Sequence, residues 1–428
     1  MRILLACEFY YPSVGGVQEV MRQVAERLAA RGHRVTVATS CLAERKSREL
    51  NGVTIVEFKV SGNAVRGMSG DIESYRRYVL ENDYDVLMIK AAQQWTFDAL
   101  LPVLDQIGKP KVFIPCGFSG LYEPEYDGYY REMPEVLGKF DHLIFYASHY
   151  RDINMARNHG LSNLSIVPNG ASESEFGVPR DPAFRLRLGI DEQSFVVLTV
   201  GTFTGDMKGH RELADSFALA RFDQRPAVLI LNGNVIPRRS QGGVRALLRA
   251  PVSNLRRGAR RLRGLVRGMP APRGDTREPI AVLVARINQA APGQGALIVD
   301  LPRAELIQAY LNSDLFVFAS NIEYSPLVLY EAAAAGLPFL TVPVGNSAEI
   351  AEWTGGGVVC PAPQDERGYT KVDPAVLAEK ITSLAASPEM LATLGHAGRQ
   401  AWSERFTWDK IVDRYEAIFV DLVGKGAS

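Results

Sequence analysis

The sequence predicts an α/β protein built from doubly wound, Rossmann-like units. In residues 314–344 an apolar run is followed by a loop, a helical segment and a second apolar run. Residues 3–39 show the same order, with a glycine-containing loop after the first apolar run. Strands that alternate with helices are typical of parallel sheets that are buried on both faces. Because the chain has 428 residues, we expect two or three domains.

Composition and charge are those of an ordinary globular protein. Hydrophobic residues make up 46% of the chain and charged residues 22%, and the formal net charge is zero. The chain as a whole therefore has no electrostatic preference for nucleic acid or for a membrane.

Cysteine spacing and hydropathy predict a cytoplasmic protein. The four cysteines show no CxxC spacing and no histidine partners at metal-binding spacing: Cys7, Cys41, Cys116 and Cys360. We expect them to be reduced and mostly buried. The apolar run at the N-terminus is too short for a signal peptide, and no stretch approaches the roughly 20 apolar residues of a transmembrane helix.

The first half of the chain begins with a predicted strand at Ile3–Cys7 and a loop that ends in Gly15-Gly16. Apolar residues recur at helical spacing from Val17, and Arg34–Thr39 is the second predicted strand. Paired glycines let a backbone N–H approach a diphosphate or an acceptor closely. Paired glycines before a helix form a simple tight turn equally often, and this loop does not match the GxGxxG motif.

Two further strands are predicted at Val86–Ile89 and Lys111–Pro115, and an aromatic, polar loop at Gln93–Phe97 follows the first of them. Asp83 and Asp85 have the DxD spacing of some metal sites. They precede their strand, however, and so lie at the sheet edge opposite to the one where such sheets bind ligands. We therefore predict a structural role for this pair.

In the second half, a buried strand at Phe195–Gly201 leads into a loop that carries Lys208 and Gly209. A lysine ammonium is a compact point charge that suits a diphosphate. The alternative is a solvated loop lysine, which the position between a strand and a helix argues against. Ala227–Asn232 is the next predicted strand, and Arg303–Leu311 is a predicted helix.

The segment 314–344 contains a predicted strand at Leu315–Ala319 and a second at Phe339–Val342. Between them we predict a helix that begins at Pro326, with Ser325 as its N-cap, and stops at Gly336. The loop before this helix faces the sheet edge at which doubly wound sheets bind ligands.

Two carboxylates belong to this segment, Glu323 in the loop and Glu331 on the helix. A helix N-terminus suits a phosphate, whereas carboxylates accept hydrogen bonds from hydroxyl groups. A ligand that is anionic at one point and rich in hydroxyls on both sides fits the pattern, and a nucleotide sugar has that layout. The alternative is a pair of surface glutamates without a ligand.

These motifs, in this order, resemble those of the retaining glycosyltransferase family 4. Its E-x7-E segment corresponds to Glu323 and Glu331, followed here by Gly-Leu-Pro at 336–338. Its glycine loop corresponds to Gly15-Gly16, and its phosphate-binding pair to Lys208-Gly209. The order of several motifs along one chain is more specific than any one of them.

The resemblance implies the GT-B fold, in which two Rossmann-like domains face each other across a cleft and a C-terminal helix crosses back to the first domain. It covers nearly the whole chain except an arginine-rich insertion at about 235–278. The IVPNG sequence at 166–170 matches the connection between the domains. The first, acceptor-side domain is then expected at 1–168 with the helix at about 410–428, and the second, nucleotide-sugar-binding domain at 169–409.

The resemblance also implies the activity, which is transfer of a hexosyl group from a nucleotide sugar to a glycan or a lipid-linked glycan. The transfer would retain the anomeric configuration and need no metal and no cofactor. Glu331 would bind the ribose hydroxyls, Glu323 the donor sugar and Lys208 the diphosphate, with Glu323 and Lys208 as the catalytic residues. The other donor-binding residues would be Gly15, Gly16, Gly209, Ser325, Pro326, Leu327 and Val328, and the acceptor side would contain Gln93, Gln94, Trp95 and Cys116.

Two departures from the family pattern keep alternatives open. Cys116 stands where the family usually has a histidine near the reacting sugar, and Thr202 where it often has an arginine. One alternative is therefore a non-catalytic protein that binds a nucleotide sugar and acts as a partner subunit or sensor. The other is a different enzyme on the same fold, such as a sugar-nucleotide epimerase or a phosphorolytic glucan enzyme.

The segment 235–274 contains 11 arginines and no lysine or acidic residue, so the rest of the neutral chain carries a net charge of −11. Apolar residues recur in it at helix-like spacing, which favours two short amphipathic pieces. We expect residues 238–273 to contact an anionic membrane surface or an anionic glycan, or else to form a solvated loop whose charge is incidental. The lack of interleaved aromatic residues argues against nucleic acid.

Overall fold

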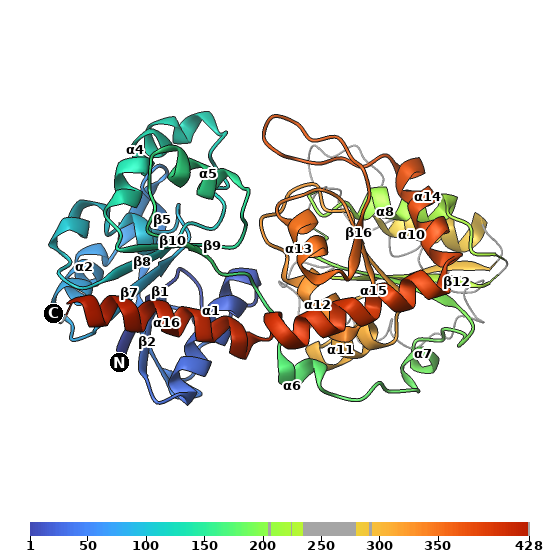
Figure 1. Cartoon of the computed structure of the whole chain (residues 1–428), viewed down its shortest axis with the longest axis horizontal. Coiled ribbons are helices and arrows are strands. Elements are labelled where there is room, and N and C mark those ends of the chain that lie inside the picture. Colours follow the sequence, from blue (N-terminus) through green and yellow to red (C-terminus); the bar gives the residue numbers. More distant parts are fainter. Residues whose placement is uncertain (204–206, 224, 234–279, 291–292, 427–428) are drawn as a thin grey trace. The chain divides into compact units, whose positions relative to one another are not determined.

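The computed structural model describes residues 1–203, 207–223, 225–233, 280–290 and 293–426, and its contacts divide the chain into two compact units (Figure 1). The first unit comprises Met1–Gly170, Tyr324–Leu327 and Glu404–Ser428, and the second comprises Ala171–Glu323 and Val328–Ser403. The arginine-rich insertion at 235–278 lies outside the described residues, so its two helical pieces and its surface contact stay predictions.

In the first unit, the described residues form an eight-stranded sheet in the order β10-β9-β8-β7-β1-β2-β4-β3. Its neighbouring strands are parallel, except β3 and β4, which pair in antiparallel fashion. The central strand β7 is buried at every residue, as expected for an apolar run inside a parallel sheet. The strands are β1 (Arg2–Ala6), β2 (Arg34–Ser40), β3 (Glu49–Leu50), β4 (Val53–Phe58), β7 (Val86–Lys90), β8 (Lys111–Ile114), β9 (His142–Phe145) and β10 (Leu164–Ile166).

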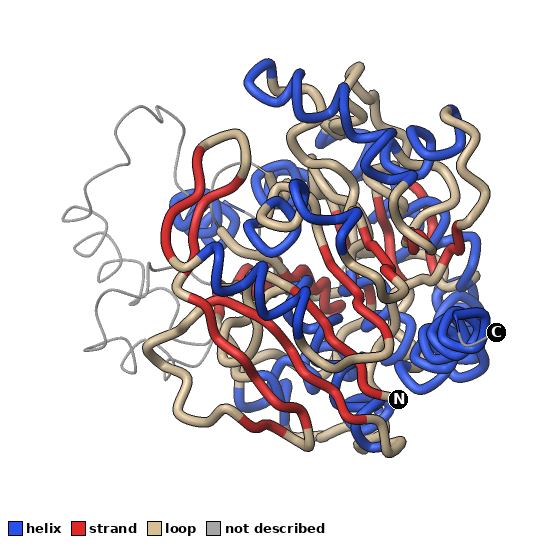
Figure 2. The backbone as a smooth tube through the Cα atoms, turned by 90° about the vertical axis from the view of Figure 1, so that its left-hand side faces the viewer, coloured by secondary structure: helices blue, strands red, loops and turns tan. Residues whose placement is uncertain are grey.

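Helices flank this sheet, and a separate hairpin of β5 (Val60–Asn63) and β6 (Gly67–Gly70) follows β4 (Figure 2). The apolar stripe of α1 is buried, because Val20, Met21, Val24 and Leu28 recur at helical spacing. The helices of this unit are α1 (Gly16–Ala30), α2 (Ile72–Glu81), α3 (Trp95–Asp98), α4 (Asp127–Gly138), α5 (Arg151–Asn158) and α16 (Trp408–Gly426), with 3-10 turns at Leu101–Gln106 and Pro124–Tyr126.

The C-terminal helix α16 packs beside α1 (Figure 1). Glu416 of α16 binds Arg31 at 2.6 Å and the His33 ring at 2.7 Å. The apolar face of α16 is buried at Ile411, Val412, Tyr415 and Phe419. The return of the C-terminal helix to the first domain, expected from the sequence, is therefore confirmed.

In the second unit, the described residues form a six-stranded parallel sheet in the order β13-β12-β11-β14-β15-β16. Its strands are β11 (Phe195–Val200), β12 (Ala227–Asn232), β13 (Gln294–Val299), β14 (Leu315–Phe318), β15 (Phe339–Thr341) and β16 (Gly357–Val359). Its helices are α6 (Glu173–Phe176), α7 (Phe184–Arg187), α8 (His210–Leu219), α10 (Ile280–Ala290), α11 (Arg303–Leu311), α12 (Leu327–Ala335), α13 (Ser347–Thr354), α14 (Pro374–Ala385) and α15 (Pro388–Ala401), with a π-helical turn at Trp402–Phe406.

The predicted strand–loop–helix–strand segment is β14, α12 and β15. The helix begins at Leu327, one residue after the predicted start. Gly336 has φ 67°, the left-handed conformation predicted for the residue after the helix. The amide of Leu337 closes the turn by donating to the carbonyl of Ala332 at 2.9 Å.

Among the parallel strands, the strand order reverses once in each sheet. In the first unit the reversal lies between β1 and β7, and in the second it lies between β11 and β14. Loops at the carboxyl ends of strands at such a switch point line a crevice that binds ligands in doubly wound folds. These two pairs of loops therefore position the candidate sites.

Candidate functional site

Lys208 and Glu323 lie on adjacent loops at the switch point of the second unit. Lys208 follows β11 and Glu323 follows β14, and 115 positions separate them in the sequence. The Lys208 ammonium forms an ion pair with the Glu323 carboxylate. The two residues predicted to be catalytic are thus side by side. Both side chains are partly exposed, and an ion pair of this kind is weak enough to exchange for a ligand phosphate.

Gly209 fixes where α8 begins. Its φ of 62° lies in the left-handed region, and a Cβ at this position would lie 1.7 Å from the carbonyl oxygen of Ala319. Glycine is therefore required for α8 to start against the end of β14. The same turn places Lys208 next to the loop that carries Glu323.

Glu331 projects from α12 into a buried polar cluster. Its Oε1 lies 2.7 Å from Nη2 of Arg303. Its Oε2 accepts a hydrogen bond from the Tyr310 hydroxyl at 2.9 Å. Burial and the adjacent Glu331 hold the pKa of Tyr310 well above its usual value, so this hydroxyl stays protonated and donates. A carboxylate has about four lone-pair sites, so both oxygens keep capacity for hydroxyl groups of a ligand.

Arg303, the first residue of α11, connects Glu331 to Glu175 of α6. Its guanidinium donates to both oxygens of Glu175, at 2.9 Å and 2.7 Å. Burial opposes the charge of Arg303, but the two carboxylates raise its pKa above the ordinary value. Because Arg303 is shared by two carboxylates, it holds the Glu331 side chain in a fixed orientation.

The backbone at Ser325–Val328, predicted to hold the sugar and phosphates, lies at the start of α12. Ser325 accepts two hydrogen bonds from the Asn169 amide, on its carbonyl oxygen and on its Oγ, each at 3.1 Å. Pro326 precedes the first helical residue, Leu327. Gly15 and Gly16 lie at the start of α1 in the first unit, after β1.

Gln93 and Gln94 follow β7 at the switch point of the first unit. Gln94 Oε1 accepts from the Glu8 amide at 3.2 Å, which connects the loops after β7 and β1. Gln93 Oε1 accepts from the hydroxyl of Ser119 at 3.0 Å and from the amide of Gly120 at 3.1 Å. The two glutamines therefore fix three neighbouring loops at this edge.

Trp95 packs in the core instead of lining that edge. It begins the short helix α3, where the sequence predicted a loop, and it is fully buried. Its indole N–H donates to Ser40 Oγ at 2.8 Å, and its ring meets Tyr75 edge-on at 4.9 Å. A ring in this position presents no face to an acceptor.

Cys116 follows β8 and has φ 61°, a left-handed conformation that is uncommon for a residue with a side chain. Burial raises the pKa of its thiol, which keeps it protonated near neutral pH. The next amide, Gly117 N, donates to the Asp152 carboxylate at 2.8 Å. Burial raises the pKa of Asp152 to about 6, although Tyr324 also donates to this carboxyl.

The Asp83–Asp85 pair binds Arg2. The Arg2 amide donates to Asp85 at 2.7 Å, its guanidinium pairs with Asp83, and hydrogen bonds from Arg2 lower the pKa of Asp85. Both carboxylates thus contact the first residue of β1, which supports the predicted structural role. Within the part of the chain that the structure describes, no three histidine, cysteine or acidic side chains are placed to hold a metal ion together.

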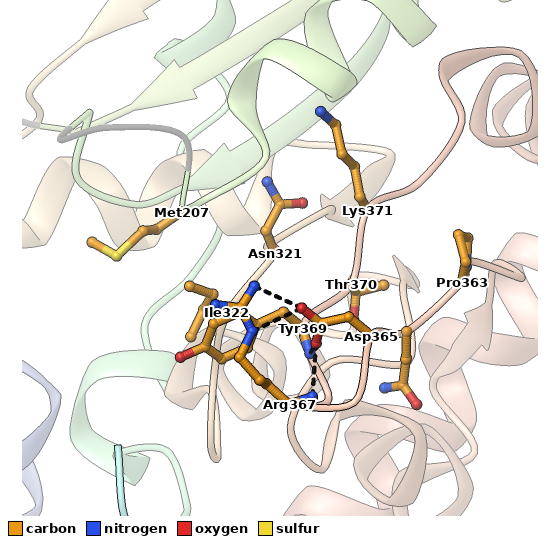
Figure 3. Close-up of a pocket in the computed structure, with 10 residues that line it drawn as sticks. Met207, Asn321, Ile322, Pro363, Asp365, Arg367, Tyr369, Thr370 and Lys371 are labelled. Carbon is orange, nitrogen blue, oxygen red and sulfur yellow. Dashed lines mark hydrogen bonds and ion pairs between the residues drawn. The ribbon is translucent and has the colours of Figure 1, made fainter. Parts of the chain in front are cut away.

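A cavity of about 510 Å³ is lined by residues that are adjacent in the sequence to Lys208 and Glu323 (Figure 3). Met207 and Ile322, which precede the two paired residues, form one wall. The loop after β16 forms another, where Asp365 binds Arg367. The residues that line the cavity are Met207, Asn321, Ile322, Pro363, Gln364, Asp365, Arg367, Tyr369, Thr370 and Lys371.

Sequence reasoning missed the residues that hold Glu331, namely Arg303, Tyr310 and Glu175. Arg303 is the first residue of a helix that follows a strand, so it lies at the ligand-binding edge, and that position is a usable signal. Tyr310 is seven residues further along the same helix, two turns away, and so faces the same side. No local signal points to Glu175, which reaches Arg303 only through the tertiary fold.

Two family models match the chain. Residues 14–175 match the model described as Glycosyltransferase Family 4, and residues 296–401 match the one described as Glycosyl transferases group 1. Over 111 residues the chain is 32% identical to N-acetyl-alpha-D-glucosaminyl L-malate synthase of Bacillus anthracis. That match covers 26% of this chain and 27% of the relative.

Solved structures match over nearly the full length. Sucrose-phosphate synthase from Thermosynechococcus elongatus has a TM-score of 0.70 at 20% identity, with 99% of each chain covered. Anabaena Alr3699/HepE, solved in complex with UDP, has a TM-score of 0.67 at 17% identity, with 98% of this chain and 100% of that chain covered. None of the described helices has the length and apolarity needed to span a membrane.

Proposed function

We propose that this chain, which belongs to the group 1 and family 4 glycosyltransferases, transfers a sugar from a nucleotide-sugar donor to an acceptor. Its fold class is GT-B, as the sequence predicted. One observation carries the proposal. Lys208 and Glu323, which are far apart in the sequence, meet at the switch point of the second sheet.

The donor binds through three groups in this proposal. Lys208 leaves Glu323 and pairs with the diphosphate, which frees the Glu323 carboxylate to accept hydrogen bonds from the sugar hydroxyls. Glu331, oriented by Arg303 and Tyr310, accepts hydrogen bonds from the ribose. A uridine diphosphate sugar is the first donor to test, because Alr3699/HepE was solved with UDP and with UDP-glucose.

The same groups supply the chemistry. As the bond between sugar and phosphate breaks, negative charge grows on the leaving diphosphate, and a preorganised lysine stabilises it. We propose that the transfer retains the anomeric configuration and needs no metal ion. The proposed acceptor is a glycan or a lipid-linked glycan, and the proposed location is the cytoplasm.

A thermal-shift screen against UDP-, GDP-, ADP- and dTDP-sugars tests donor binding. A ligand that binds only the folded state at 100 times its Kd stabilises it by about 2.7 kcal/mol. We expect one nucleotide class to raise the Tm and the others to have little effect. No shift with any of them would contradict the proposal, and a shift without sugar transfer would favour the non-catalytic alternative.

A further inference from the structure

His210 is a buried histidine directly after the Lys208-Gly209 pair. It is the first residue of α8, a helix of 10 residues, and only 6% of its surface is exposed. Its Nε2 atom is buried and has no hydrogen-bond partner among the residues that the structure describes. A buried polar atom without a partner is costly and uncommon, and it often marks a ligand site.

The ring of His210 is held in place and directed toward the end of β11. Phe203 packs against it, with 4.6 Å between the ring centroids. A Cβ on Gly201 would lie 3.3 Å from His210 Nε2 and 3.5 Å from Lys208 Cγ. The Nε2 atom therefore faces Gly201 beside the stem of Lys208, at the switch point of the sheet.

The start of α8 favours an anion at the same place. A helix N-terminus has free N–H groups and a partial positive charge. In the described part of the chain no side chain caps this helix. Gly209 keeps the turn tight, as its left-handed φ and its closeness to Ala319 require.

We propose that His210 donates a hydrogen bond from Nε2 to the diphosphate of the donor. This inference rests on the proposed function and adds a phosphate-binding residue to it. The contact lies beside Gly201, at the carboxyl end of β11.

The proposal requires a proton on Nε2. Burial, and then the nearby charge of Lys208, lower the pKa of His210 to about 4, so the ring is neutral at pH 7. A neutral imidazole carries a single N–H group. With that proton on Nε2, the group that faces Gly201 is a donor, which suits the acceptor oxygens of a phosphate.

The test compares binding of a nucleoside diphosphate and of its nucleoside. UDP, GDP, ADP and dTDP are titrated by calorimetry, and the tightest ligand is then measured against His210→Phe and His210→Gln. Phenylalanine keeps the contact with Phe203 and removes the donor, whereas glutamine keeps an N–H group near the position of Nε2. We expect His210→Phe to weaken diphosphate binding roughly 10- to 100-fold, as for loss of a hydrogen bond to a charged group. His210→Gln should lose much less.

The matching nucleoside, which lacks phosphates, is measured by competition as the control. Its affinity should be the same in all three proteins, with unchanged unfolding midpoints. Equal diphosphate affinity in wild type and His210→Phe would overturn the inference and leave the proposed function standing. A parallel loss of nucleoside affinity would show a structural role and would also overturn it. If the wild type binds none of the four diphosphates, the proposed function fails, and this inference fails with it.

Discussion

At the scale of single residues, the orientation of Glu331 depends on its neighbours more than on its own helix. Arg303 and Tyr310 contact one carboxylate oxygen each, and Glu175 holds Arg303 from the other side. Such a group is fixed before a ligand arrives, which lowers the entropic cost of binding. Although Glu331 is only 8% exposed, both of its carboxylate oxygens therefore have partners.

Replacing Glu331 with alanine should weaken binding of the donor's nucleoside diphosphate roughly 10- to 100-fold, because hydrogen bonds between ribose hydroxyls and a carboxylate are lost. Calorimetry on the purified proteins measures this. Glu352→Ala removes an exposed glutamate of α13 in the same unit and is the matched control. Unchanged affinity in Glu331→Ala would remove Glu331 from the donor site.

Asp152 gives a stability prediction that depends on pH. Its pKa is raised from 3.8 to about 6 by burial in the folded state, so between these values the folded state binds more protons than the unfolded state. The free energy of unfolding should therefore fall as pH rises from about 4 to about 6, and this group should add no further change above that. This fall in the free energy of unfolding should be roughly 2–3 kcal/mol.

Denaturant unfolding of wild type and Asp152→Asn at pH 4, 5, 6 and 7 isolates this contribution, because asparagine does not titrate. As pH rises from 4 to 6, the unfolding free energy of wild type should fall relative to that of Asp152→Asn. A difference that is constant across this range would mean that Asp152 has an ordinary pKa in the folded protein.

At the scale of helices and strands, the local sequence pattern predicted most of the elements that carry the site. The predicted bounds of β11, β12, β14 and α11 lie within one or two residues of the observed bounds. Gly336 was predicted as a helix stop and has the left-handed φ. The strand β13 was missed, because its apolar run is only four residues long and begins after a glutamine and a glycine. Trp95 was placed in a loop, because a helix as short as α3 is stabilised by tertiary packing and has no periodic pattern of its own.

The residues of the site were also only partly predictable from the sequence. Lys208, Glu323 and Glu331 were named from motifs, and the structure adds the ion pair between the first two. Arg303, Tyr310 and Glu175 were not named, because their contacts join residues between 21 and 128 positions apart. Local spacing cannot show which distant charges will meet. The fold decides that through strand order.

Gly209→Ala tests the turn between β11 and α8. Alanine there meets both an unfavourable φ of 62° and the carbonyl oxygen of Ala319 at 1.7 Å, so the turn must move. Gly355→Ala is the matched control, since Gly355 has φ 61° and its nearest neighbour would lie 3.5 Å away. The control should lose about 1–2 kcal/mol of unfolding free energy through φ alone.

Gly209→Ala should lose more than this control and should also bind the nucleoside diphosphate more weakly, because Lys208 shifts with the turn. Chemical unfolding and calorimetry on both variants provide the two measurements. Equal stability loss in the two variants, with normal ligand binding in Gly209→Ala, would show that the close approach to Ala319 does not matter.

At the scale of the whole molecule, the proposed chemistry relies on Lys208 and the start of a helix, not on a divalent cation. Activity should therefore survive excess EDTA, measured as release of nucleoside diphosphate from the donor. The prediction is wrong if EDTA abolishes turnover and Mn2+ or Mg2+ restores it.

The arginine-rich segment gives a prediction from charge alone. Its 11 arginines carry no compensating acid within 235–274, and each arginine near an anionic leaflet contributes roughly 1 kcal/mol. The protein should sediment with anionic liposomes but not with neutral ones, and less so at high salt, because salt screens exposed charges. Deleting residues 238–273 should abolish sedimentation and leave donor binding unchanged. Equal recovery with neutral vesicles, or none with either, would assign the segment to a solvated loop.

The most direct test of the central proposal is consumption of a nucleotide sugar by the purified protein. Each UDP-, GDP-, ADP- and dTDP-sugar is incubated with wild type and with Lys208→Ala, with membrane lipid and glycan extracts as acceptors, and free nucleoside diphosphate is quantified by chromatography. We expect the wild type to release the diphosphate from one donor, and Lys208→Ala to do so at least 10-fold more slowly. No release from any donor, or equal release by both proteins, would contradict the proposed donor site.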